Sequence, residues 1–237
     1  MIQSDYPAPL PGAHTQGIRL FLDTADTREW QNWLPTGLFY GITTNPLLLE
    51  RDNVSCTIEQ LQDLAKVGFN LGAQEVQLQT WGNSVDSLVK TGKLLAGISD
   101  SIVVKVPITK IGTQAASLLI GEGIRVTLTA VYAVHQVAIA AALGADYTAP
   151  YLGRINDLGR NGYDDLVAME KIISGLGSTT RILVASIRSV DDIAFLASQG
   201  LNTFTFSPAI AAEFFDVAAT AQAASDFQEA ARKMGGN

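Results

Sequence analysis

The sequence has little cysteine, histidine or charge, and each shortage excludes a class of protein. Cys56 is the only cysteine among the 237 residues, so the chain cannot form an internal disulfide. His14 and His135 are its only histidines, and with one cysteine they leave no recognisable zinc site. We therefore expect no metal centre, and the lack of disulfides fits a reducing, cytoplasmic compartment.

Positive charge is also scarce, and long apolar runs do not occur. The 16 Lys and Arg residues stand against 23 Asp and Glu residues, a net charge of -7. A surface of this sign repels nucleic acid and anionic lipid, so we expect neither a nucleic acid nor a membrane as a partner. The longest apolar stretch, Val131 to Ala145, is interrupted by His135 and Gln136, and it falls short of the roughly 18 apolar residues of a membrane span.

What the chain does contain is apolar sequence in short, regularly repeated pieces. Hydrophobic residues make up 47% of the chain and charged residues 16%, which excludes disorder and predicts a large core. Strand-like runs alternate with segments of helical spacing. The eight predicted strands are Arg19–Asp23, Phe39–Thr43, Glu75–Gln79, Ile102–Val106, Ile124–Thr129, Asp146–Pro150, Arg181–Ser186 and Asn202–Ser207. The clearest predicted helices are Thr57–Leu71, Gly112–Gly121, Ala133–Leu143, Asp164–Leu176 and Val190–Ser198.

This alternation predicts an α/β protein with a parallel sheet and helical crossovers. Eight units in about 200 residues favour a single (β/α)₈ TIM barrel over its main rival, a doubly wound open sheet. We assign the barrel to residues 18–217 and expect an irregular arm over 1–17, which holds Pro7, Pro9 and Pro11 but lacks the features of a secretory signal. Residues 218–237 form an extra C-terminal segment, helical in pattern from Ala218 to Met234.

Polar side chains stand at the ends of all eight predicted strands. In a barrel of this type the chemistry lies at the carboxyl ends of the strands, so these residues are expected to meet at one rim. They are Asp23, Thr44 and Asn45, Gln79, Lys105, Thr129, Tyr151 and Arg154, Ser186 and Arg188, and Ser207.

Lys105 is the most informative of them, because it interrupts the apolar strand Ile102–Val106. Lysine is rarely buried without a reason. Sharing the parity of Val103, it is expected to face the barrel interior, where desolvation and a nearby Arg154 or Arg188 lower its pKa and supply a neutral amine that attacks carbonyls. The alternative is a structural ion pair with Asp23, which is weakly stabilising at best.

Five motifs then resemble, in order and spacing, those of the small transaldolase family, which includes fructose-6-phosphate aldolases. The resemblance covers about Ile18 to the C-terminus and rests on the segments 21–26 (FLDTAD), 41–46 (GITTNP), 103–109 (VVKVPIT), 149–155 (APYLGRI) and 185–188 (ASIR). It implies a class I, Schiff-base enzyme on a (β/α)₈ barrel that uses no cofactor. It also implies a homo-oligomer, a decamer or pentamer, in which the last helix packs on a neighbouring subunit.

The resemblance also implies residue roles. Lys105 forms the Schiff base with a ketose, while Asp23 and Asn45, preceded by Thr44, bind the dihydroxyacetone portion. Two alternatives stay open: Asp23 caps the following helix, or the Thr44-Asn45-Pro46 segment only shapes a turn.

Gln79, Thr129 and Tyr151 match the family positions that hold the catalytic water and move the proton of the scissile alcohol. The resemblance implies that transaldolases place a glutamate and usually a phenylalanine where this chain has Gln79 and Tyr151, whereas the aldolases place glutamine and tyrosine there. An amide cannot accept a proton as a carboxylate does, so Tyr151 becomes the expected acid and base, with its pKa lowered by Lys105 or Arg154. A packing role for Tyr151 is the alternative.

Arg154, Ser186 and Arg188 follow strands six and seven, where a barrel rim suits a sugar phosphate. Surface ion pairs of the arginines with Asp157 or Asp191 are the alternative. The sequence thus predicts a fructose-6-phosphate aldolase-like enzyme that releases glyceraldehyde 3-phosphate. A transaldolase that transfers dihydroxyacetone to erythrose 4-phosphate in the pentose phosphate pathway, and a non-catalytic sugar-phosphate-binding subunit, are the alternatives.

Overall fold

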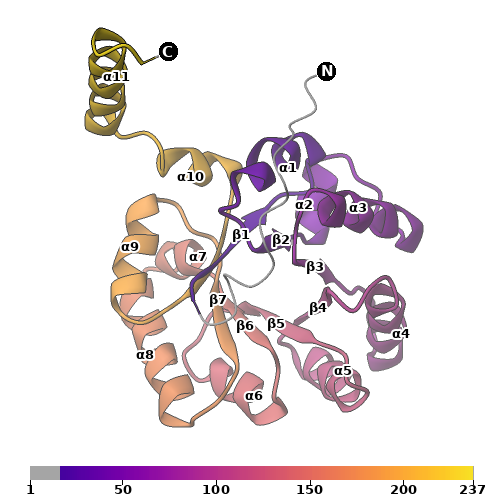
Figure 1. Cartoon of the computed structure of the whole chain (residues 1–237). Coiled ribbons are helices and arrows are strands. Elements are labelled where there is room, and N and C mark those ends of the chain that lie inside the picture. The colour runs from indigo at the N-terminus through magenta and orange to yellow at the C-terminus, as the bar shows by residue number, and fades with distance from the viewer. Residues whose placement is uncertain (1–16, 237) are drawn as a thin grey trace.

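Eight short parallel strands form a closed barrel in which each strand pairs with the next and β8 returns to β1. The computed structural model describes residues 17–236. The strands are β1 (Arg19–Asp23), β2 (Gly41–Thr43), β3 (Glu75–Gln79), β4 (Ile102–Pro107), β5 (Val126–Val131), β6 (Tyr147–Pro150), β7 (Arg181–Val184) and β8 (Thr203–Phe206). Helices surround the barrel (Figure 1), which confirms the predicted (β/α)₈ fold. The predicted arm over residues 1–17 lies, apart from Gly17, outside the described residues.

The helices that follow the strands include every one that the sequence predicts. They are α1 (Thr27–Trp33), the 3-10 turn η1 (Leu34–Thr36), α2 (Pro46–Arg51), α3 (Ile58–Asn70), α4 (Val85–Ala96), α5 (Lys110–Gly121), α6 (Gln136–Leu143), α7 (Leu152–Asp157), α8 (Gly162–Gly175), α9 (Val190–Ser198), α10 (Pro208–Glu213) and α11 (Ala218–Lys233). The short helices α2, α7 and α10 follow directly on strand ends that carry predicted site residues. They are too short for a helical apolar period to reveal them.

Four strands end at a residue other than the predicted one: β4 and β8 differ by one residue, and β5 and β7 differ by two. β5 continues to Val131 through a register shift after Leu128, where Ala130 has a φ of 60°. β7 stops at Val184, and Ser186 beyond it has a φ of 57°. This left-handed conformation costs free energy for any residue other than glycine, and non-glycine residues that adopt it are concentrated at functional sites.

The two faces of the strands bury different residues. The outward faces join the helices in one apolar core that includes Leu22, Ile42, Val104 and Phe206. The barrel interior holds a smaller apolar cluster of Phe21, Val103, Tyr147, Ala149 and Leu183. Buried polar side chains fill the rest of the interior, among them Thr43, Gln77, Lys105, Thr127 and Thr205.

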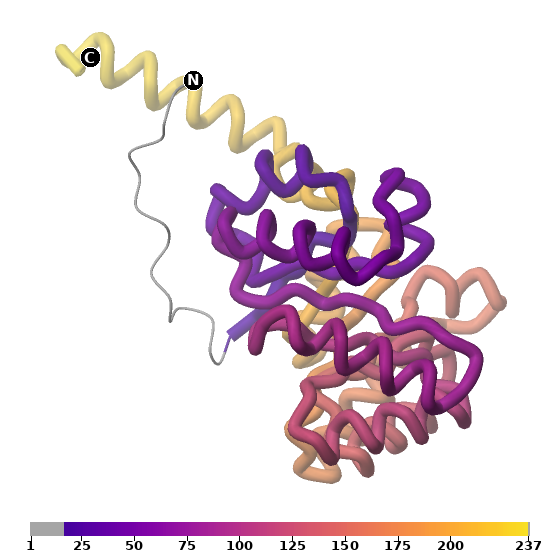
Figure 2. The backbone as a smooth tube through the Cα atoms, turned by 90° about the vertical axis from the view of Figure 1, so that its right-hand side faces the viewer, coloured from indigo at the N-terminus to yellow at the C-terminus, as the bar shows by residue number. Residues whose placement is uncertain are grey.

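Helix α11 stands apart from the barrel. Figures 1 and 2 show it extending away from the body of the molecule after α10, and none of its residues is buried. Its packing on a neighbouring subunit stays a prediction. No described helix is long and apolar enough to cross a membrane.

Candidate active site

Lys105 lies inside the barrel with only 5% of its surface exposed. It shares the inward parity of Val103, and its Nζ donates a hydrogen bond to the backbone oxygen of Thr44 at 2.8 Å. Burial lowers the pKa of Lys105, and the charge of Asp23 opposes that shift. Among the described residues no ion pair joins the two side chains, so the alternative of a structural Lys105–Asp23 pair is not formed. The amine is desolvated rather than neutralised by a partner.

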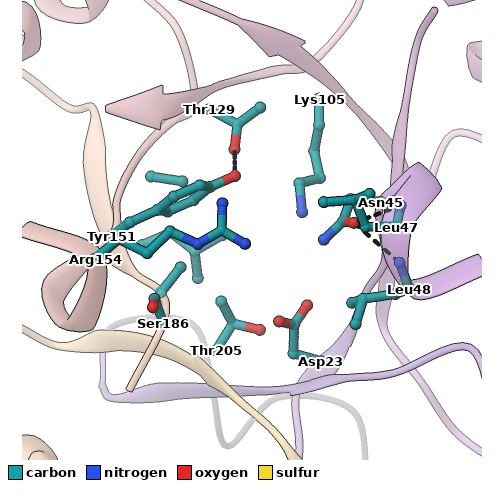
Figure 3. A pocket seen from close by; sticks show the side chains of 13 residues that line it. Asp23, Asn45, Leu47, Leu48, Lys105, Thr129, Tyr151, Arg154, Ser186 and Thr205 are labelled. Atoms are coloured by element: carbon teal, nitrogen blue, oxygen red, sulfur yellow. Dashed lines mark hydrogen bonds between the residues drawn. The ribbon is translucent and has the colours of Figure 1, made fainter. Parts of the chain in front are cut away.

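A cavity of about 130 Å³ opens beside this amine at the carboxyl ends of the strands. Figure 3 shows the Lys105 ammonium, the Arg154 guanidinium and the Asp23 carboxylate directed toward one another across it. Seven of the predicted site residues line the cavity: Asp23, Asn45, Lys105, Thr129, Tyr151, Arg154 and Ser186. Six further residues line the cavity and were not predicted from the sequence: Leu47, Leu48, Ala149, Leu183, Ala185 and Thr205.

Asp23, at the end of β1, is held by the barrel and not by a helix. Its Oδ1 accepts a hydrogen bond from the Thr43 hydroxyl at 2.6 Å, and the Thr43 and Thr205 hydroxyls lie 2.5 Å apart. The cap of α1 is Asp26, whose side chain accepts from the backbone of Arg28, so the alternative that Asp23 caps this helix is wrong. The Thr43 hydroxyl fixes one carboxylate oxygen of Asp23 at the cavity wall.

Asn45 has two functions, one at each end of its amide. Its Oδ1 accepts hydrogen bonds from the backbone N–H groups of Leu47 and Leu48 and caps α2. Its nitrogen faces the cavity near Lys105 (Figure 3). The same residue therefore caps the helix and presents its amide nitrogen to the cavity.

We expect Asn45→Asp to separate these two functions. Aspartate is as good an N-cap as asparagine, so the unfolding free energy should stay within about 0.5 kcal/mol of the native value. Asn45→Ala removes the cap and should cost about 1 kcal/mol. Both variants lose the donor, so KM for the substrate should rise in both. A normal KM in Asn45→Asp would show that the amide nitrogen does not contact substrate.

Tyr151, immediately after β6, forms the opposite wall. Its hydroxyl lies 2.8 Å from the Thr129 hydroxyl, and its ring packs edge-on against Tyr132 and beneath the Arg154 guanidinium, 5.0 Å from the ring centre. Burial raises the pKa of Tyr151, and the hydrogen bond with Thr129 and the charge of Arg154 only partly offset this. The expected lowering is therefore wrong: Tyr151 is a phenol at neutral pH.

The three predicted site residues that do not line this cavity are Thr44, Gln79 and Arg188. Thr44 contributes its backbone oxygen to Lys105. Gln79 ends β3 beside Lys105, its partner in the strand register. Arg188 is exposed and forms a two-point ion pair with Asp157, which is one of the surface ion pairs that the sequence left as an alternative. Within residues 17–236 no group of His, Cys, Asp or Glu side chains is arranged to hold a metal ion.

Comparison with known proteins gives the family of the chain. The profile of the family described as "Transaldolase/Fructose-6-phosphate aldolase" matches residues 20–236. The chain belongs to this family. A "Probable transaldolase" of Jannaschia sp. (strain CCS1) is 33% identical over 193 residues, which are 81% of this chain and 87% of the relative. A "Probable transaldolase" of Rhodospirillum centenum (strain ATCC 51521 / SW) is 31% identical over 221 residues, 93% of this chain and 94% of the relative.

Membership of the transaldolase/fructose-6-phosphate aldolase family confirms the predicted family and the prediction that the protein is an enzyme of the transaldolase type. The match covers the barrel together with α11.

Proposed function

We propose that this transaldolase-family enzyme cleaves a ketose phosphate such as fructose 6-phosphate through a Schiff base on Lys105. The observation that carries the proposal is the desolvated Lys105 amine at a cavity with Asp23 and Tyr151 on its walls. A buried amine with a lowered pKa is available in its neutral, nucleophilic form at lower pH than an exposed lysine.

The first half of the reaction makes an electron sink. The neutral Nζ of Lys105 adds to C2 of the ketose, and loss of water from the carbinolamine leaves an iminium. The Asp23 carboxylate lies close enough to Lys105 for its charge to raise the pKa of the amine, so it is suited to stabilise the iminium cation that forms. Asn45 directs its amide nitrogen into the same space and is suited to bind a hydroxyl of the dihydroxyacetone portion.

The second half breaks the C3–C4 bond. Removal of the C4 hydroxyl proton sends the C3–C4 electron pair into the iminium, which releases glyceraldehyde 3-phosphate and leaves an enamine of dihydroxyacetone. The Tyr151 phenol accepts that proton as it passes its own proton to a water held with Gln79, and the water releases a proton to solvent; the Thr129 hydroxyl lies at hydrogen-bond distance from the phenol. Because Tyr151 rests as a phenol, it is ready to donate a proton in the reverse direction, when the enamine attacks an aldehyde.

The phosphate end of the substrate is assigned to Arg154 and Ser186 at the rim. Both line the cavity, and the left-handed backbone of Ser186 turns the chain there. Arg188 would have to leave Asp157 to take part.

Hydrolysis of the enamine makes the enzyme an aldolase, and its capture by an aldehyde such as erythrose 4-phosphate makes it a transaldolase. We favour the aldolase, because the Gln79 and Tyr151 pair is that of the aldolase subgroup. The names of the relatives, each a "Probable transaldolase", favour the second function.

The decisive measurement is release of glyceraldehyde 3-phosphate from fructose 6-phosphate, without and then with erythrose 4-phosphate, with Lys105→Met as the blank. We expect sustained turnover without the acceptor. A burst of about one equivalent that resumes only with acceptor would make the protein a transaldolase and would refute our interpretation of Gln79 and Tyr151.

A further inference from the structure

A second cavity, of about 310 Å³, opens at the opposite end of the barrel from Lys105. Arg19 and Arg181 are the first residues of β1 and β7, and Arg125 directly precedes β5. Because all eight strands are parallel, these three arginines meet at the amino rim, and all of them line the cavity together with Tyr147. A cluster of three arginines is conspicuous in a chain with a net charge of -7.

One of the three arginines is neutralised. Arg125 donates to Glu75 at 2.7 Å and to Asp146 at 2.8 Å. Glu75 is almost fully buried and also accepts from the Tyr147 hydroxyl at 3.1 Å and from Gln77 at 2.9 Å. Both carboxylates at this rim are thus committed to Arg125 and to the neutral groups around it.

The other two arginines have only uncharged partners among the described residues. Arg19 donates to the Tyr147 hydroxyl at 2.6 Å and stacks over the Tyr40 ring, while its buried Nε has no hydrogen-bond partner within residues 17–236. Arg181 donates to Asn202 and to the Thr203 hydroxyl, each at 3.1 Å. Burial and the charge of Arg19 lower the pKa of Arg181, so the two cations are close enough to repel each other.

We propose that this amino-rim cavity is an anion-binding site that takes a phosphate group, free or as a small phosphomonoester, between Arg19 and Arg181. Asp146 also lines the cavity, but its carboxylate is paired with Arg125. A phosphate dianion supplies what Arg19 and Arg181 lack: a negative charge, and acceptor oxygens that match the planar donor fork of each guanidinium. A volume of about 310 Å³ suits an anion with a small organic substituent. The site is separate from the active site, whose cavity lies at the other rim and is lined by Arg154.

Occupation of the amino-rim cavity also affects the barrel interior. Arg19 reaches Tyr147, which donates to Glu75, and Gln77 joins Glu75 to the Thr127 hydroxyl at 2.8 Å. Thr127 is the register neighbour of Lys105 on the adjoining strand. An anion that pairs with Arg19 therefore stabilises the polar floor beneath the active site, and its binding should raise the stability of the folded chain.

The test is thermal unfolding of the full chain in phosphate and in chloride at matched pH and ionic strength. We expect phosphate to raise the melting temperature of the native protein by a few degrees. Because phosphate also suits Arg154 in the active-site cavity, the amino-rim contribution is measured in Arg154→Gln: this variant should keep a rise, and adding Arg181→Gln to it should remove that rise. Adding Arg232→Gln instead, an equal change of charge on exposed α11, should keep it. Glycerol phosphate, which offers no carbonyl to Lys105, tests the phosphomonoester: a larger rise than with inorganic phosphate identifies it as the better ligand, and an equal or smaller rise identifies the free ion.

Three results would overturn the proposal: no rise in the native protein, an equal rise when Arg181→Gln is added to Arg154→Gln, or loss of the rise in Arg154→Gln alone. Should Arg181→Gln fail to fold, crystals of the native protein soaked in tungstate decide the question. Anomalous density between Arg19 and Arg181 supports the site, and density confined to Arg154 refutes it.

Discussion

Replacing Lys105 by methionine is expected to abolish turnover and, at the same time, to raise the melting temperature. Loss of the only route to a Schiff base should lower kcat by about 10⁴-fold or more. The structural reason for the gain in stability is the burial of an amine that retains 5% exposure and has no carboxylate partner. Methionine fills a similar volume and carries no charge that must be desolvated. The desolvation free energy saved in this way should exceed the roughly 1 kcal/mol lost with the hydrogen bond to Thr44.

The gain in stability depends on pH, and its sign follows from the lowered pKa of Lys105. In the folded state the amine loses its proton at lower pH than in the unfolded chain, where it titrates near 10.4. The unfolded state therefore binds more protons between the two pKa values, and the native protein becomes more stable as pH rises through that window. The advantage of Lys105→Met should be greatest below the folded pKa and should vanish near pH 10.4.

Two measurements and a control make the prediction specific. Borohydride reduction with dihydroxyacetone should leave an adduct on the native protein and none on Lys105→Met. Lys90→Met, the same change on the exposed surface of α4, should keep both the activity and the melting temperature. Failure of the native protein to form the adduct would favour the non-catalytic sugar-phosphate-binding subunit. A lower melting temperature in Lys105→Met would show that the amine stabilises the barrel.

The barrel could be predicted because its strands are recognisable in the sequence as short apolar runs. Runs such as Ile102–Val106, apart from Lys105, are apolar on both faces, as is typical of a strand buried by helices outside and side chains inside. The strand ends could not be placed to the residue, because a register shift at Ala130 and a left-handed Ser186 are decided by packing at the rim. No local pattern marks either position.

The site could be predicted where one residue contradicts its surroundings, as Lys105 does, and less well elsewhere. Thr205 was not predicted, because the prediction rested on the last residue of the strand, Ser207. The alternation along β8 does indicate it: Phe204 and Phe206 pack outward, so Thr203 and Thr205 face inward. Ser207 itself caps α10. The pairing of Arg188 with Asp157 depends on the distance between two loops, which composition does not reveal.

Replacing Tyr151 by phenylalanine is expected to separate carbon–carbon cleavage from Schiff-base formation. The phenol contacts Thr129 and lies on the wall opposite Asp23, away from the Lys105 hydrogen bond to Thr44. Formation of the iminium should therefore persist in Tyr151→Phe, and borohydride should still trap dihydroxyacetone on Lys105. The rate of glyceraldehyde 3-phosphate release should fall about 10²- to 10⁴-fold, the usual contribution of a positioned acid or base.

Tyr132→Phe is the matched control, because Tyr132 packs edge-on against Tyr151 and contacts Arg154 through its own hydroxyl at 3.4 Å. Loss of the Tyr132 hydroxyl should leave the Arg154 guanidinium less firmly held and raise KM, with little change in kcat. A cleavage rate in Tyr151→Phe within about threefold of the native rate would mean that a water on Gln79 moves the proton unaided.

The pH dependence of the reverse reaction gives the same assignment independently. Burial raises the pKa of Tyr151 above its ordinary value near 10, so the phenol keeps its proton throughout the neutral and mildly alkaline range. A protonated Tyr151 supplies the proton that the aldehyde oxygen takes up when the enamine attacks it. The rate of aldol addition, measured under saturating dihydroxyacetone, should therefore show no alkaline decline until about pH 10 or above. In Tyr151→Phe that decline should disappear while the acid limb, set by Lys105, stays in place, because the variant keeps the Lys105 amine and its hydrogen bond to Thr44.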